Sequence, residues 1–170
     1  MAASAAAGRP DAAGFLPHAE RLFRRAIIDS EPVALFAIDV DYLKALNDSF
    51  SARVGDWILQ EIAAQLRASF RAGDLPARVG DDHFMILLPG VNAAAAQSSA
   101  ERLRQQLARN AVTIDNVRVP FTVSIGVACS QHAIEFSAFM QLADTALARA
   151  KQQGRNTVSV LHAESLFAES

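Results

Sequence analysis

The stretch Val33-Ala-Leu-Phe-Ala-Ile-Asp-Val-Asp41 decides the fold, because it is an apolar run that ends in two acidic residues. A short continuous apolar run bounded by turn signals is typical of a strand buried on both faces. We therefore predict a buried strand over residues 33–38 with carboxylates at its C-terminal end. The segment Ser30-Glu31-Pro32 separates this strand from a helix that begins near Pro17 and that apolar residues at helical spacing predict up to about Asp29.

In the rest of the chain, segments with apolar residues at helical spacing alternate with short segments typical of strands. Helices are predicted over 42–47, 54–70, 92–109 and 136–153, and strands over 75–79, 83–88, 121–128 and 157–160, with a further alternating stretch over 112–119 that turns at Asp115-Asn116. Gly80-Asp81-Asp82 forms the tip of a β-hairpin between two of these strands. This order predicts an α/β sandwich with a mixed or mainly antiparallel sheet.

The composition limits the class of protein. The 170 residues are 51% hydrophobic and 20% charged, which suits one folded domain and argues against intrinsic disorder. One cysteine excludes a disulfide scaffold, and a net charge of −2 gives no general reason to expect a nucleic acid polymer as partner. No apolar run approaches the ~20 residues of a membrane span, so we expect no membrane insertion by this chain. The expected organisation is a linker over 1–14, one domain over 15–161 and a frayed tail over 162–170.

Acidic residues gather at two predicted strand ends. Asp39 and Asp41 end the buried strand, and Asp81 and Asp82 lie at the hairpin tip. If the two strands are neighbours, these carboxylates converge at one edge of the sheet, and oxygen ligands of this kind suit Mg²⁺ together with substrate phosphates. The alternative is that the aspartates only cap strands and turns through local hydrogen bonds.

Three cations lie close to this acidic edge in the predicted fold. Lys44 follows the first acidic pair, and Lys151 and Arg155 flank a helix end closed by Gly154. Lys44 and Lys151 are the only lysines among 16 basic residues. Cations at a helix C-terminus are favourable for dipole reasons alone, so this position of Lys151 does not by itself indicate a ligand.

The loop before the hairpin contains Arg71-Ala72-Gly73-Asp74. An arginine fork can bond to O6 and N7 of guanine, and an aspartate can accept from guanine N–H donors. The spacing therefore suits a guanine-binding pair, although the alternative is an ordinary surface ion pair of little energetic value.

Taken together, these motifs resemble the GGDEF domain family of bacterial diguanylate cyclases over about residues 11–160. The family's DxDxFKxxND block, RxxD, TVSIGVA and ADxALxxAKxxGRN correspond in order to residues 39–48, 71–74, 122–128 and 143–156. The signature itself departs from GG(D/E)EF, since it stands as Gly80-Asp81-Asp82-His83-Phe84. Asp81 replaces a glycine, which adds a charge where substrate phosphates approach, and His83 replaces an acid that the family needs for turnover.

The resemblance implies a role for each matching residue and a five-stranded, mainly antiparallel sheet surrounded by helices, similar to nucleotide cyclase and polymerase palm domains. The implied roles are metal binding by Asp39, Asp82 and Asp41, catalysis by Asp82 and His83, guanine recognition by Asn47 and Asp56, phosphate binding by Lys44, Lys151 and Arg155, and cyclic di-GMP binding by Arg71, Asp74 and Arg102. Mg²⁺ is expected only if GTP binds, and cyclic di-GMP binding requires no cofactor.

Four functions follow as hypotheses. The first is a degenerate GGDEF domain without cyclase activity that binds cyclic di-GMP through the RxxD site and regulates an attached domain or a signalling partner. The second is an active diguanylate cyclase that converts two GTP into cyclic di-GMP and two pyrophosphates, with product inhibition at the same RxxD site. A GTP-binding regulator and a nucleotide-free dimerisation module are the other two. The resemblance also implies the bacterial cytoplasm, a larger signalling protein and a ligand-bridged homodimer.

Overall fold

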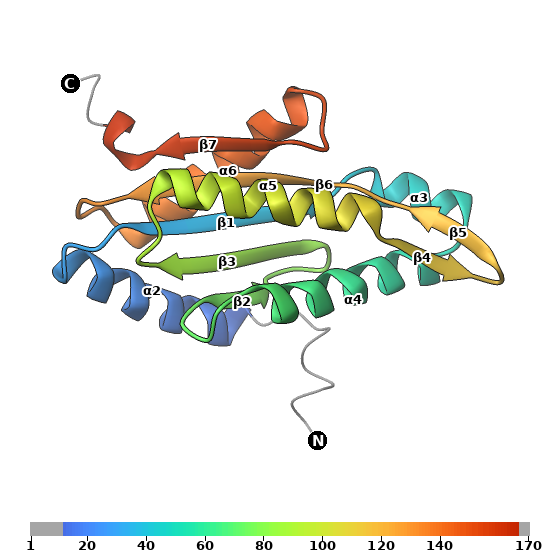
Figure 1. The fold of residues 1–170 in the computed structure, drawn as a ribbon, viewed down its shortest axis with the longest axis horizontal. Coiled ribbons are helices and arrows are strands. Elements are labelled where there is room, and N and C mark those ends of the chain that lie inside the picture. The colour runs from blue at the N-terminus through green and yellow to red at the C-terminus, as the bar shows by residue number, and fades with distance from the viewer. Residues whose placement is uncertain (1–11, 167–170) are drawn as a thin grey trace.

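The computed structural model describes residues 12–166 and forms a sheet with helices on both faces (Figure 1). The elements are α2 (Ala12–Ile28), β1 (Val33–Val40), α3 (Leu43–Ser49), α4 (Ala52–Ser69), β2 (Leu75–Arg78), β3 (His83–Pro89), α5 (Ala93–Arg109), β4 (Ala111–Ile114), β5 (Val117–Pro120), β6 (Val123–Ser130), α6 (Phe136–Gln152), β7 (Val158–His162) and the 3₁₀ helix η1 (Ala163–Leu166). Within residues 12–166, no helix is long and apolar enough to cross a membrane.

The main sheet has five strands in the order β2-β3-β1-β6-β7. Every neighbouring pair is antiparallel except β6 and β7, which run parallel. The predicted fold class is therefore confirmed, with β1 at the centre of the sheet. The register places Asp39 directly opposite His83 on one side and Ser124 on the other.

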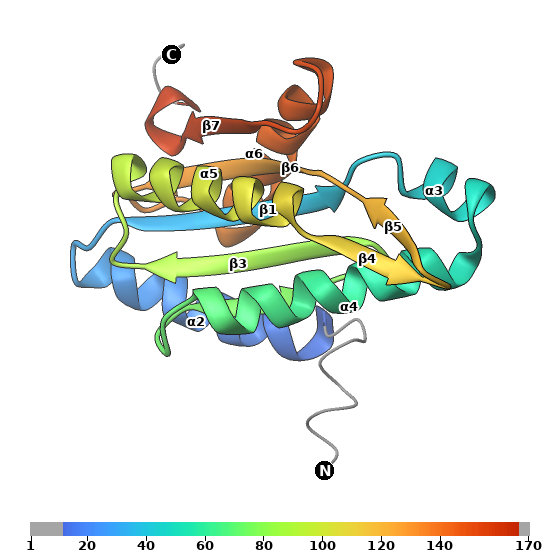
Figure 2. The same cartoon turned by 45° about the vertical axis from the view of Figure 1, so that its right-hand side comes forward.

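Alternation along β1 sends side chains into two separate cores, as expected for a strand covered on both faces. Phe36 and Ile38 pack into one core with α4 and α5, whereas Leu35 and Ala37 pack into the other with α2 and α6. Figure 2 shows α4 and α5 lying on the same side of the sheet. Asp39 follows Ala37 in this alternation, so its side chain emerges on the face that α6 covers.

Gly126 of β6 allows α6 to approach the sheet closely. A Cβ atom at this position would lie 2.1 Å from the backbone nitrogen of Leu147 and 2.4 Å from the carbonyl oxygen of Ala143. Only glycine permits this contact between strand and helix. The close approach fixes the height of α6 above the strand end that carries Asp39.

Both predicted chain ends need correction where the structure describes them. Residues 12–14, which were expected to belong to a linker, form the first turn of α2, while residues 1–11 lie outside the described part. Residues 162–166, expected to be frayed, complete β7 and form η1, whose Ala163 is fully buried. Packing of this last turn against the sheet orders a segment that has no periodicity of its own.

Candidate functional site

The end of β1 carries an ion-pair group that we call the Asp39 cluster, made of Asp39, His83, Asp144 and Lys151. Asp39 Oδ1 lies 2.6 Å from His83 Nδ1, and Asp39 Oδ2 accepts a hydrogen bond of 2.5 Å from Lys151 Nζ. The second ring nitrogen of His83 is 3.6 Å from Asp144 Oδ1. The strand register brings His83 to Asp39, and α6 supplies the other two side chains.

The Asp39 cluster changes the proton affinity of its members. Burial raises the pKa of Asp39, but hydrogen bonds from His83 and Lys151 outweigh this effect, so the net pKa lies below its usual value. Burial lowers the pKa of His83, but its hydrogen bond to Asp39 and the charges of Asp39 and Asp144 raise it above the usual value. These opposite directions are those of a carboxylate paired with a cation.

Asp41 lies two residues further along and has a different environment, because it is buried and accepts hydrogen bonds from three groups. Thr122 Oγ1 and Ser124 Oγ donate to its carboxylate at 2.7 and 2.6 Å, and the backbone N–H of Asn156 donates at 2.9 Å. Asp41 thus joins the end of β1 to the start of β6 and to the turn after α6. This geometry favours a positioning role, in contrast to the metal-binding role that was expected for Asp41.

The two residues expected to recognise guanine line one cavity. Asn47 and Asp56 border a space of about 410 Å³, together with Asp81 and Asp82 of the hairpin tip. Asn47 Oδ1 also accepts a 2.9 Å hydrogen bond from the N–H of Gly55, where a Cβ would lie 2.3 Å from the same oxygen. The cavity therefore combines the expected guanine readers with three carboxylates, one of which is the substituted Asp81.

The three cationic side chains that were expected to bind phosphate lie in different environments. Lys151 contacts Asp39, and the guanidinium of Arg155 lies over the Tyr42 ring at 4.8 Å from its centroid. Both Arg155 and Tyr42 have positive φ angles, of 64° and 56°. Lys44 is exposed on α3, and no contact joins it to the Asp39 cluster among the described residues.

The loop of Arg71 to Asp74, which we call the RxxD loop, connects α4 to β2. Arg71 donates to Asp74 through Nε at 3.4 Å and Nη2 at 3.1 Å, and its backbone N–H donates at 3.0 Å. Arg71 Nη2 also donates to the carbonyl oxygen of Pro89 at 3.2 Å. The structure therefore brings Arg71 and Asp74 together, while Arg102 lies exposed on α5 without a contact to either among residues 12–166.

Sequence reasoning missed several residues that shape the site. Asp144 lies seven residues before Lys151, a spacing that places both on one helix face and could have indicated their proximity. Arg78 donates to the carbonyl oxygens of Gly80 and Asp81 and so holds the hairpin tip. Its position two residues before the tip was the available signal, whereas nothing local marks Thr122 and Ser124 as partners of Asp41.

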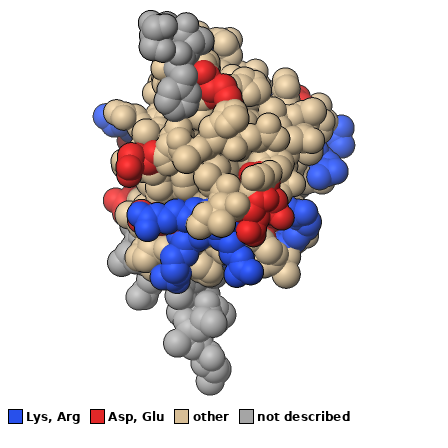
Figure 3. All heavy atoms as spheres, turned by 90° about the vertical axis from the view of Figure 1, so that its left-hand side faces the viewer, with Lys and Arg blue, Asp and Glu red and all other residues tan. Residues whose placement is uncertain are grey.

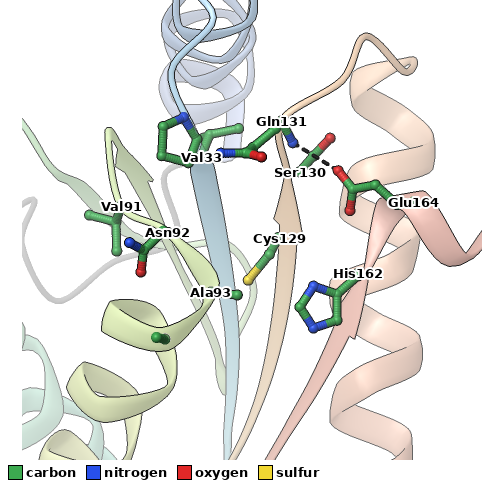
Figure 4. Close-up of a pocket in the computed structure, with 11 residues that line it drawn as sticks. Val33, Val91, Asn92, Ala93, Cys129, Ser130, Gln131, His162 and Glu164 are labelled. Carbon is green, nitrogen blue, oxygen red and sulfur yellow. Dashed lines mark hydrogen bonds between the residues drawn. The ribbon is translucent and has the colours of Figure 1, made fainter.

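A separate cavity of about 290 Å³ lies beside the C-terminal ends of β6 and β7 and contains none of the expected site residues. Cys129, His162 and Glu164 are among its lining residues (Figure 4), and Glu164 accepts a 3.0 Å hydrogen bond from the N–H of Gln131. Burial raises the pKa of the Cys129 thiol to about 12. The thiol therefore stays protonated near neutral pH and is not an activated nucleophile.

The sheet order and the carboxylates at the ends of β1 and β3 define an α+β domain of the nucleotide cyclase type. The chain belongs to the GGDEF family, since the family model described as "Diguanylate cyclase, GGDEF domain" matches residues 10–157. It is 34% identical over 142 residues to the response regulator PleD of Caulobacter vibrioides, a match that covers 82% of this chain and 31% of the relative. The chain spans about a third of the length of such curated relatives.

Solved structures support the same assignment. The active GGEEF domain of a diguanylate cyclase from Vibrio cholerae superposes with a TM-score of 0.82 at 26% identity, covering 89% of this chain and 96% of that one. The diguanylate cyclase SiaD from Pseudomonas aeruginosa, solved in complex with its activator SiaC, gives a TM-score of 0.84 at 28% identity, covering 94% and 64%. The GGDEF assignment and the α+β fold are thereby confirmed.

Cyclases of this family use Mg²⁺ with GTP, so the fit of a metal to the present residues can be examined. Both oxygens of Asp39 are already paired, and Asp82 lines the neighbouring cavity. Among residues 12–166, no group of three or more His, Cys, Asp or Glu side chains is arranged to hold a metal. In the described arrangement, a divalent cation at Asp39 would have to displace the hydrogen bonds from His83 and Lys151.

Replacing Asp41 by alanine should destabilise the domain by roughly 3 kcal/mol or more, because three donors in a buried site lose their charged acceptor. Urea denaturation measures the free energy of unfolding. Asp48→Ala on the exposed surface of α3 is the matched control and should change stability by less than roughly 0.5 kcal/mol. Equal stability of the two variants would contradict the role assigned to Asp41.

Proposed function

We propose that this domain is a cyclic di-GMP receptor that acts as a regulatory module in bacterial second-messenger signalling and has no cyclase activity. The ligand binds at the RxxD loop through Arg71 and Asp74, and Arg102 contributes from α5. The observation that carries the proposal is the organised pair of Arg71 and Asp74, whose geometry suits guanine. The hairpin tip and the Asp39 cluster, which together we call the catalytic end, carry substitutions at two of the five signature positions.

The Arg71–Asp74 pair is arranged to receive a ligand without a large rearrangement. The Asp74 side chain is 2% exposed and holds the guanidinium through both of its oxygens, whereas the Arg71 side chain is 64% exposed. Protein contacts within residues 12–166 use Nε and Nη2 of Arg71, which leaves the N–H donors of Nη1 to face solvent. An N–H of Nη1 can donate to O6 or N7 of guanine, and preorganisation lowers the entropic cost of binding.

The end of the molecule that carries the RxxD loop includes basic side chains that can attract an anionic ligand. This loop lies toward the left-hand end of the molecule in Figure 1, and Figure 3 shows several Lys and Arg side chains on that end, with Asp and Glu side chains among them. A few placed arginines are enough to attract a small dianionic dinucleotide, so the net charge of −2 does not oppose the proposal.

The catalytic end gives two physical reasons against turnover. His83 occupies the position of an acid and is bonded to Asp39, so it is not available to act on a substrate hydroxyl in this arrangement. Asp81 adds a carboxylate to a cavity that already contains Asp56 and Asp82. A carboxylate ~4 Å from a phosphate oxygen costs about 1–4 kcal/mol, depending on the effective dielectric.

The domain would act as part of a larger signalling protein in the bacterial cytoplasm, since the chain spans about a third of its curated relatives. SiaD, which was solved in complex with its activator SiaC, is an example of a diguanylate cyclase that binds a protein partner. A two-fold symmetric ligand such as cyclic di-GMP can also bridge two copies of the domain. We therefore propose an attached domain, a signalling partner or a ligand-bridged homodimer as the recipient of the signal.

Cyclic di-GMP should bind the wild-type chain, and Arg71→Ala or Asp74→Ala should weaken binding by at least roughly tenfold. The reason is the loss of a hydrogen bond to a charged group, worth about 1.5–3 kcal/mol. Isothermal titration calorimetry measures the affinity, and Arg109→Ala, an exposed arginine on α5, is the control. No heat with the wild type, or undiminished affinity in both variants, would refute the proposed site.

Purified protein incubated with GTP and Mg²⁺ or Mn²⁺ should form no cyclic di-GMP above the level found with heat-denatured protein. His83 and Asp81 are the reason, because one removes the acid and the other repels the triphosphate. Chromatography of the products measures turnover. Product that accumulates in proportion to the enzyme concentration would instead establish the chain as an active cyclase with the RxxD loop as an inhibitory site.

A further inference from the structure

The pairing of β1 with β3 brings residue 83 into direct contact with Asp39. The two residues are opposite one another in the antiparallel register, where Cβ atoms lie roughly 4.5–5.5 Å apart. A carboxylate at position 83 would face Asp39 as a like charge and would need a cation between the two. The imidazole of His83 needs none, because its Nδ1–H donates directly to Asp39 Oδ1 over 2.6 Å.

The second carboxylate oxygen of Asp39 is also paired with a protein group. Lys151 Nζ lies 2.5 Å from Asp39 Oδ2, and the Asp39 side chain is only 19% exposed. His83 Nε2 faces Asp144 at 3.6 Å, so the ring spans two carboxylates as a bound cation would. Mg²⁺ requires near-octahedral oxygen ligands at about 2.0–2.1 Å, and two nitrogen donors already occupy the approaches to this carboxylate.

We propose that His83, together with Lys151, takes the position of a divalent cation beside Asp39, and that His83 is the residue that prevents this domain from binding Mg²⁺ or Mn²⁺ there. The inference depends on the proposed function only in treating the domain as inactive toward GTP. It concerns the opposite end of β3 from the RxxD loop and explains how the acidic site remains electrically balanced without a metal.

The test is a titration of the chain with Mn²⁺, followed by electron paramagnetic resonance of the free ion. His83→Glu should create a site that binds Mn²⁺ at least roughly tenfold more tightly than the wild type, the scale of effect expected for residues that tune a metal site. His18→Glu, at an exposed position on α2, makes the same substitution away from the Asp39 cluster and is the matched control. It should bind Mn²⁺ no more tightly than the wild type.

Thermal unfolding followed by circular dichroism provides the second measurement. Mn²⁺ should raise the melting temperature of His83→Glu, or restore its folding, and should leave that of the wild type unchanged, because only a ligand that binds the folded state stabilises it. His83→Asp is a second variant for the same comparison.

Two outcomes would overturn the inference: a wild-type Mn²⁺ site as tight as that of His83→Glu, or variants at residue 83 that bind no better than His18→Glu. Calorimetry with cyclic di-GMP on the same samples keeps the proposals apart. Failure of the wild type to bind cyclic di-GMP refutes the proposed function, whereas the Mn²⁺ data alone decide the role of His83.

Discussion

The hydrogen bond between Asp39 and His83 is the contact on which the interpretation of this domain depends. It exists because β1 and β3 are antiparallel neighbours, and their register places His83 directly opposite Asp39. A slip of one residue would move every apolar side chain of β1 to the wrong core, so packing on both faces enforces the contact. Lys151 then completes the pairing from α6, held close by the absence of a side chain at Gly126.

Strand β3 connects the two regions to which a function is assigned, the catalytic end and the RxxD loop. His83 is the first residue of β3, and Pro89, whose carbonyl accepts from Arg71, is the last. Six steps at about 3.3 Å separate them by roughly 20 Å. The substituted residues Asp81 and His83 therefore lie at the opposite end of β3 from the RxxD loop. Under the proposed function, this separation is what allows one domain to lose turnover and keep a ligand site.

Much of the fold could be predicted from local patterns. The apolar run before Asp39, the hairpin tip at Gly80-Asp81-Asp82 and the glycine after α6 each depend on neighbours in sequence, and the structure has the corresponding elements. The turn at Asp115-Asn116 is also observed, with positive φ angles at both residues. The folded tail could not be predicted, because η1 is ordered by tertiary packing and has no pattern of its own.

The site was less predictable than the fold, for a physical reason. Residue types and order indicated which side chains gather at the acidic edge, but not which atoms pair. The contact from Lys151 to Asp39 spans 112 positions in sequence, and those from Ser124 and Asn156 to Asp41 span 83 and 115. Partners at such distances follow from sheet register and helix packing. For this reason the sequence predicted metal binding by Asp39 but did not indicate the contacts of Asp39 with His83 and Lys151.

Chemical-shift mapping by ¹H–¹⁵N NMR during titration with cyclic di-GMP tests the separation of the two ends most directly. We expect the largest shifts in residues 71–74, at Gly90 and around Arg102, with the hairpin tip and the turn at residues 154–156 little changed. Shifts centred instead on residues 79–83 and 154–156 would place the ligand at the catalytic end and contradict the receptor mechanism.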